Sequence, residues 1–165
     1  KLGEKIIVGE EISSGEGDII GLYLNSKIDR DLGAAKTVEL IHAQGGLVYV
    51  PHPFEKVRKG LGEEVLNNIK NEIDILEVFN GRALFAFYNK QSMKYAQENN
   101  LIWASSSDSH CYQEIGRAYT TISEIPTVLN LKSLIGAGEL YRGYSSRRHL
   151  FCPKLNKIKK RVRNV

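Results

Sequence analysis

The sequence predicts an α/β fold in which short, largely parallel strands alternate with helices. Apolar runs rich in Val and Ile recur along the chain, and most are separated by stretches in which apolar residues have helical spacing. Side chains that can bind metal follow several of these runs, as in folds whose chemistry gathers at the carboxyl ends of parallel strands. The pattern argues for parallel strands in an α/β or barrel arrangement.

The predicted elements are short and evenly spread. The expected strands, in chain order, are residues 5–8, 19–24, 47–50, 73–79, 101–104 and 119–122. The expected helices are residues 31–44, 63–72, 82–99 and one within 123–135. The first two strands flank a Gly-rich turn and should form a hairpin. Asp31 is expected to cap the first helix, and Gly45-Gly46 to end it.

Length and composition indicate one domain. A chain of 165 residues with 42% hydrophobic content can bury a core without disulfides or structural metal. Cys111 and Cys152 have neither metal-ligand spacing nor a disulfide framework, so a reduced, cytoplasmic compartment is expected. Cys111 is either a small packed residue or a soft ligand beside His110. No apolar run reaches the roughly 18 residues that cross a bilayer, so no membrane association is expected.

Charge is unevenly distributed along the chain. Residues 141–165 contain nine Arg or Lys and no acidic residue, whereas residues 1–140 carry a net charge of −5. The sequence therefore divides into an α/β domain over 1–140 and a basic C-terminal tail over 141–165. Such a tail either attracts a polyanion such as nucleic acid or is a solvated terminus.

Asp108 and His110 follow the predicted strand 101–104 after a run of serines. Their i, i+2 spacing can direct a carboxylate and an imidazole toward one divalent ion. The alternative is a turn in which Asp108 caps the next segment. Either arrangement places both side chains just beyond a strand end.

Other candidate ligands occupy similar positions. Pro51 and Pro53 restrict the backbone around His52, which places this histidine on a rigid turn after strand 47–50. Glu11 follows strand 5–8, and Glu77 with Asn80 ends strand 73–79. We therefore expect one shared metal site. Its candidate ligands are Glu11, His52, Asp108 and His110.

Several of these segments resemble the PHP family, named for polymerase and histidinol phosphatase. The similar segments are Gly9-Glu10-Glu11-Ile12-Ser13, the stretch 41–53 ending in Pro51-His52-Pro53, the stretch 77–82, Ser107-Asp108-Ser109-His110, and the stretch 114–120. They run in the family's order from about residue 3 to about residue 122. Ser106 and Ser109 replace the Gly and Ala that family members usually have around the Ser-Asp-x-His core.

The resemblance implies roles for individual residues. Glu11, His52, Asp108 and His110 match the family's metal ligands, whereas His42 matches a helix position and is expected to be structural. Glu77 and Asn80 are expected either to hold the metal ligands in place or to contact substrate, and not to bind metal themselves. The family's N-terminal His-x-His and Asp-His motifs are absent from this sequence. The resemblance therefore implies the C-terminal two-thirds of a distorted β/α barrel that lacks its first strands.

The activity implied by the resemblance is hydrolysis of a phosphate ester by water activated on divalent ions. The ions would be Mn, Zn or Fe, two or three in a complete site and fewer here. His52, Asp108 and His110 are the catalytic candidates, since an unligated imidazole can act as acid or base. Arg82 and Arg117 either hold a substrate phosphate or form ion pairs.

The sequence leaves more than one substrate class and more than one function open. Nucleotides, nucleic acid ends and other phosphate esters are compatible with the resemblance, and the basic tail favours a nucleotide or nucleic acid. The second hypothesis is a catalytically incomplete fragment that acts as a nucleic-acid or protein binding module. Salt-dependent binding without phosphate release would distinguish this module from an enzyme.

Overall fold

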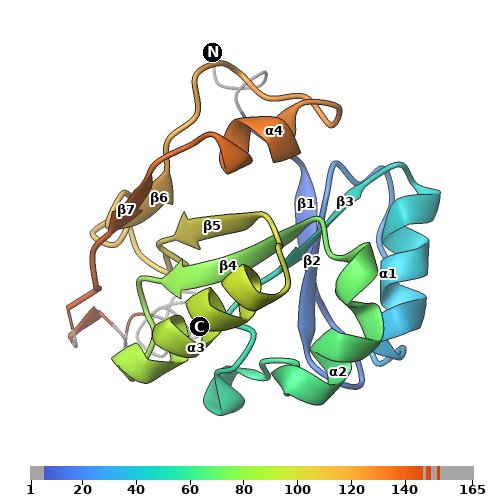
Figure 1. Ribbon diagram of the computed structural model, residues 1–165, viewed down its shortest axis with the longest axis horizontal. Helices are drawn as coiled ribbons and strands as arrows, with labels where there is room; N and C mark the ends of the chain where they lie inside the picture. Colours follow the sequence, from blue (N-terminus) through green and yellow to red (C-terminus); the bar gives the residue numbers. More distant parts are fainter. Residues whose placement is uncertain (1–5, 147, 150–151, 153–165) are drawn as a thin grey trace, which may run out of the picture.

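The computed structural model describes residues 6–146, 148, 149 and 152, and its centre is a five-stranded mixed sheet (Figure 1). The strands, which lie side by side in chain order, are β1 (Gly9–Ser13), β2 (Asp18–Leu22), β3 (Leu47–Val50), β4 (Ile75–Asn80) and β5 (Trp103–Ser106). β1, β2 and β3 pair antiparallel, whereas β3, β4 and β5 pair parallel. The described sheet is open, with β1 and β5 at its edges.

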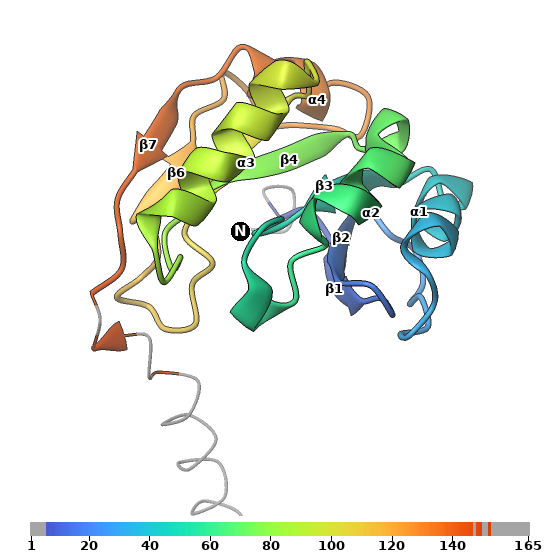
Figure 2. The same ribbon diagram turned by 60° about the horizontal axis from the view of Figure 1, so that its bottom comes forward.

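Helices cover one face of this sheet, as Figure 2 shows. They are α1 (Ala34–Ala43), α2 (Gly62–Ile69) and α3 (Ala86–Glu98), with single 3-10 turns at η2 (Lys56–Arg58) and η3 (Lys70–Glu72). Alternate strand residues such as Val48, Val50 and Val78 point into the core formed with these helices. This is the larger of the two apolar clusters.

Among the residues that the structure describes, those that cover the opposite face of the sheet lie at one end of it. A two-stranded antiparallel sheet of β6 (Ala118–Thr120) and β7 (Leu140–Arg142) lies beside β5, and α4 (Leu131–Gly136) packs over the sheet through Leu131. Leu47 and Ile75 point toward this side, and so do Tyr49 and Glu77 by strand alternation. Polar side chains thus reach this less covered face from the middle of the sheet.

Several predicted boundaries were wrong. Residues 6–8 are not a strand, Lys5 lies outside the described residues, and β1 begins at Gly9. Glu11 is therefore inside a strand and not beyond its end. The α1 cap is Gly33, and Asp31 lies in a turn with a φ of 63°. Instead of Asp31, the Glu16 carboxylate accepts a hydrogen bond from the Ala34 amide at 2.6 Å.

The later predicted strands and helices are present in the structure, but their bounds differ from the prediction. β5 begins at Trp103, so Ser105 and Ser106 belong to the strand and do not end it. The helix predicted over 82–99 begins at Ala86, and the one predicted within 123–135 is the short α4. Of the predicted tail, residues 147, 150, 151 and 153–165 lie outside the described residues. Among those that are described, no helix is both long and apolar enough to cross a bilayer.

Candidate metal centre

His52 is fixed in place by the backbone that follows β3. Between its two prolines it adopts a φ of 30°, a conformation that L residues rarely take, and it is 7% exposed. Its amide donates to the Glu77 Oε2 atom at 2.6 Å, which closes the turn against β4. The imidazole Nε2 atom lies 3.4 Å from Glu11 Oε1. Strained backbone of this kind is common at functional sites.

Glu11 and Asp18 reach His52 from the β1–β2 hairpin. Ser13 lies opposite Asp18 in the pairing register, and the Ser13 hydroxyl donates to the Asp18 carboxylate at 2.8 Å. One ligand atom each from Glu11, Asp18 and His52 lies within 4.8 Å of the other two. We call these three residues the ligand triad. Its two carboxylates and one imidazole fit a hard or borderline divalent cation.

Asp108 and His110 lie in the loop after β5. The Asp108 carboxylate accepts from Asn80 Nδ2 at 3.2 Å and from the Arg58 guanidinium. The His110 Nδ1 atom lies 2.9 Å from the Asp108 backbone carbonyl oxygen. A φ of 49° at Asp108 turns the chain sharply here. Both residues thus follow a strand end.

A cavity of about 460 Å³ connects most of the predicted site residues. Its polar end is lined by Glu11, His52, Glu77, Asn80 and Asp108, and its apolar end by side chains of the sheet and of α4. His110 is not among the lining residues. We call this space the site cavity.

Glu77 and Asn80 connect the strand ends beneath the site cavity. Glu77 is 2% exposed and accepts hydrogen bonds from Tyr49 at 3.1 Å, from Asn80 Nδ2 at 2.9 Å, and from the Ser106 hydroxyl. Burial raises the pKa of Glu77 despite these donors. The buried Glu77 carboxylate also accepts the hydrogen bond from the His52 amide, and in this way it orients the His52 turn.

Arg58 is a site residue that sequence reasoning missed. It lies on η2, six residues after His52, with its side chain 23% exposed. The guanidinium donates to Asp108, to the buried Glu55 and, at 3.0 Å, to Asn80 Oδ1. Its position in the loop that follows Pro51-His52-Pro53 was the available signal. It places one positive charge among several acids.

The two arginines expected to hold a substrate phosphate lie elsewhere. Arg82 is 7% exposed, and its Nη1 atom lies 2.7 Å from the buried Glu114 carboxylate. Glu114 also accepts from the His110 amide at 2.8 Å, so this ion pair holds the Asp108 loop. Arg117 is exposed, donates to the Gln113 carbonyl at 3.4 Å, and does not line the site cavity.

Glu11 and His52 of the ligand triad shift each other's pKa values toward their charged forms. The hydrogen bond from His52 lowers the pKa of Glu11. Burial alone would lower the pKa of His52, but the Glu11 hydrogen bond and the nearby Glu77 and Asp108 charges raise it overall. The arrangement therefore favours an ionised Glu11 carboxylate beside a protonated His52 ring.

Comparisons with known proteins identify the relationship. A protein-family profile described as PHP-associated matches residues 87–140. A crystal structure of a two-domain protein from Bacteroides vulgatus, described as containing a predicted PHP-like metal-dependent phosphoesterase, superimposes with a TM-score of 0.63 at 16% identity, over 92% of this chain and 49% of that one. The chain is related to the PHP family.

Other relatives of this PHP-related chain are longer than it is. Two uncharacterized proteins of Methanocaldococcus jannaschii, MJ0417 and MJ1587, are 34% identical over 72% of this chain and 40% identical over 48% of it. The matches cover 52% and 45% of those proteins, so the chain spans about half the length of these curated relatives. PsfC from Pseudomonas syringae has a similar fold, with a TM-score of 0.57, 13% identity and coverage of 93% and 65% of the two chains.

Proposed function

We propose that this chain is part of a metal-dependent phosphoesterase that hydrolyses a phosphate ester, with a nucleotide or nucleic acid as the substrate class. The ligand triad carries the proposal, because two carboxylates of the β1–β2 hairpin and the imidazole that follows β3 have ligand atoms within 4.8 Å of one another, and Glu11 and His52 line the polar end of the site cavity. The PHP relationship supports this chemistry. In this proposal the open sheet is part of a distorted barrel.

The ligand triad would hold one divalent ion, with Asp108 and His110 as ligands of a second. Mn, Zn and Fe all accept carboxylate and imidazole ligands. When bound, such ions would neutralise charge on the phosphoryl oxygens and lower the pKa of water toward about 7. The chain's own contribution is to hold the ligands in place through Glu77, Asn80 and Glu114.

Arg58 is the residue best placed to contact a phosphate. Its guanidinium contacts Asp108, which lines the site cavity, and a planar guanidinium binds phosphate oxygens bidentately. Arg82 and Arg117 are less well placed, because Arg82 faces Glu114 and Arg117 does not line the cavity. His52 and His110 are the imidazoles near the reacting end that could move a proton.

Turnover of bis(4-nitrophenyl) phosphate in the presence of Mn²⁺ tests the proposal. His52→Ala should abolish the metal-stimulated rate, because it removes the imidazole of the ligand triad. His42→Ala is the matched control, since His42 contacts Asp74 at 3.0 Å and does not line the site cavity. Equal rates in these two variants, or no metal stimulation in the unmodified chain, would contradict hydrolysis at this site.

A binding module is the second candidate function. The basic composition of residues 141–165 supports it, because a segment with nine Arg or Lys and no acid attracts polyanions. Nucleic-acid binding that weakens with salt, in a chain that releases no phosphate, would favour this function over hydrolysis.

A further inference from the structure

A second hollow lies on the helical side of the molecule, between α3 and β7. Its volume is about 310 Å³. We call it the basic groove, and its lining residues include Phe79, Asn89, Lys90, Met93, Lys94, Arg142 and Tyr144. It shares no lining residue with the site cavity. The proposed hydrolysis uses none of the residues named here.

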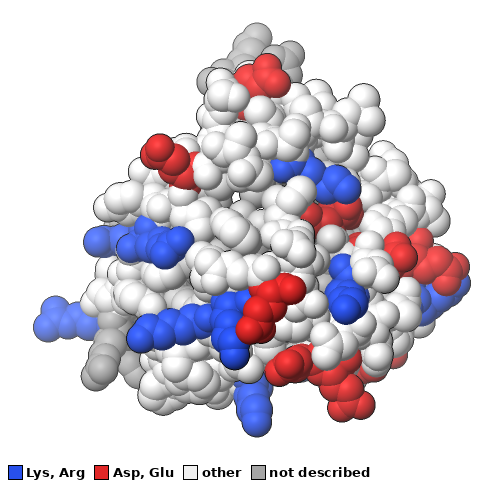
Figure 3. Space-filling view, viewed as in Figure 1, with Lys and Arg blue, Asp and Glu red and all other residues white. Residues whose placement is uncertain are grey.

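The charge of the basic groove is positive. Lys90, Lys94 and Arg142 line it, and no acidic residue is among the described residues that do so. Lys94 lies 3.6 Å from Glu98, a pair between exposed side chains that solvent largely screens. Figure 3 shows Lys and Arg over α3 and β7 with acidic side chains beside them at one end of α3, and acidic side chains together with further Lys and Arg over α1 and α2. An anion is therefore the complementary ligand.

The groove also offers an aromatic surface. Tyr144 is 47% exposed, and its ring packs against Phe79 with centroids 4.9 Å apart. The Tyr144 hydroxyl accepts a hydrogen bond from Asn89 Nδ2 at 3.3 Å. Asn89 is 8% exposed and is itself held by Asn80, whose amide donates to Asn89 Oδ1 at 3.0 Å. The Tyr144 ring is thus held by Phe79 and by Asn89, while part of its surface faces solvent.

We propose that the basic groove binds single-stranded nucleic acid, with phosphates against Lys90, Lys94 and Arg142 and a base stacked on Tyr144. Cationic side chains beside an exposed aromatic ring are the combination that binds single strands without base-specific contacts. A duplex keeps its base faces stacked inside the helix and offers none to Tyr144. The inference deepens the proposed function and rests on its nucleic-acid substrate class, but binding in the groove needs neither metal nor hydrolysis, so the two can be tested separately.

Asn80 lies between the basic groove and the site cavity. Asn80 contacts Asn89 on the groove side and Asp108 on the side of the site cavity. A nucleic-acid strand held in the groove would therefore have one end close to Asn80 and Asp108, which line the site cavity. The chain also continues from Arg142 into residues 143–165, which contain only basic charges.

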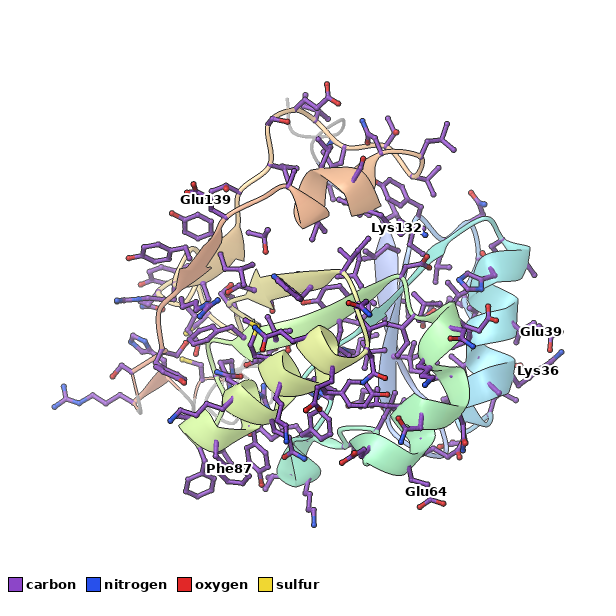
Figure 4. The ribbon with its side chains drawn as sticks, in the orientation of Figure 1. Lys36, Glu39, Glu64, Phe87, Lys132 and Glu139 are labelled. Carbon is purple, nitrogen blue, oxygen red and sulfur yellow. The ribbon has the colours of Figure 1, made fainter. Side chains whose placement is uncertain are left out.

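Fluorescence anisotropy with a labelled oligothymidine of about 12 nucleotides, in buffer containing EDTA, tests the charges. Lys90→Glu with Arg142→Glu should weaken binding at least tenfold and reduce the slope of log K against log salt by about 1.4. Lys36→Glu with Lys70→Glu makes the same change in net charge away from the groove. Figure 4 labels Lys36 on α1, far from α3. Equal binding by the two double variants would overturn the proposal.

A second variant separates nucleic acid from other polyanions. Tyr144→Leu keeps an apolar contact with Phe79 but removes the stacking surface, so oligothymidine binding should weaken about tenfold. Heparin, which has no bases, should bind this variant as it binds the unmodified chain. Tyr112→Leu is the control, because Tyr112 is 79% exposed and does not line the groove. If Tyr144→Leu binds oligothymidine normally, or loses heparin equally, the groove is not a nucleic-acid site.

Discussion

Arg58 places a fixed positive charge among the acids of the candidate metal centre. It donates to the Asp108 carboxylate, a predicted metal ligand, and to the buried Glu55. An oxygen that accepts from a guanidinium is a poorer ligand than one whose lone pairs are available. Arg58 and a divalent ion therefore compete for Asp108.

Replacing Arg58 should strengthen metal binding. Arg58→Met keeps much of the aliphatic stem and removes the guanidinium, so Mn²⁺ should bind about tenfold more tightly by isothermal titration calorimetry. Arg30→Met is the matched control, because Arg30 pairs with Asp31 at 3.0 Å on the exposed surface. Unchanged or weaker Mn²⁺ binding by a folded Arg58→Met chain would show that Arg58 does not compete.

The sequence predicted several residues that the structure places in the candidate metal centre, and it missed others. His52 was recognisable because two prolines define its backbone, and Asp108 with His110 because their spacing survives a shift in strand boundary. Asp18 was missed because its contribution depends on the hairpin register, which places it opposite Ser13 and near Glu11. Arg58 was missed because its contacts join segments 22 and 50 residues apart in the chain.

The loop after β3 is the element on which the site depends most. Gly60 closes it, with its amide donating to the Glu55 carbonyl at 3.0 Å. A Cβ atom at Gly60 would lie 2.5 Å from the His52 carbonyl oxygen and 2.7 Å from the Pro53 carbonyl oxygen. Backbone atoms cannot move away as a flexible side chain can. The loop that carries His52 and Arg58 therefore requires glycine here.

Gly60→Ala should lower the free energy of unfolding by about 2–4 kcal/mol and weaken Mn²⁺ binding, because it displaces the His52 turn. Urea unfolding measures the first effect and titration calorimetry the second. Gly136→Ala provides the comparison, since a Cβ there meets no atom within 4 Å. A Gly60→Ala chain as stable as Gly136→Ala would disprove the close approach.

Asp74 connects three elements at the opposite end of the sheet. Its carboxylate accepts from the Val48 amide and from Lys132 of α4, both at 2.8 Å, and lies 3.0 Å from the His42 imidazole of α1. Burial would raise the pKa of Asp74, but these hydrogen bonds outweigh it and lower the pKa. The ionised carboxylate therefore stabilises the folded state.

This lowered pKa gives a pH dependence of defined sign. The stabilisation is complete above the unfolded-state pKa of about 3.9 and is lost as pH falls through the lower folded-state value. Asp74→Asn should therefore cost about 1 kcal/mol at pH 7, and the difference from the unmodified chain should shrink below about pH 4. Urea unfolding across pH measures it, with the exposed Asp29→Asn as control. A difference that grows in acid would contradict the assignment.

At the scale of the whole molecule, the two faces of the sheet have different roles. One face is covered by α1, α2 and α3, while the other holds Tyr49, Glu77 and the site cavity. The α/β class and the parallel pairing of β3, β4 and β5 followed from apolar runs separated by helical spacing. The antiparallel pairing of β2 with β3 and the open form of the described sheet did not, because strand order depends on contacts between distant segments.

Metal content per chain tests the ligand triad most directly. Elemental analysis after loading with Mn²⁺ and desalting should find about one or more ions per chain in the unmodified protein and in His42→Ala. Asp18→Asn and His52→Ala should lose that metal, because the first removes a carboxylate charge and the second an imidazole nitrogen from the three groups whose ligand atoms lie within 4.8 Å of each other. Retention of metal by both variants, or its absence from all four proteins, would contradict a metal centre at this position.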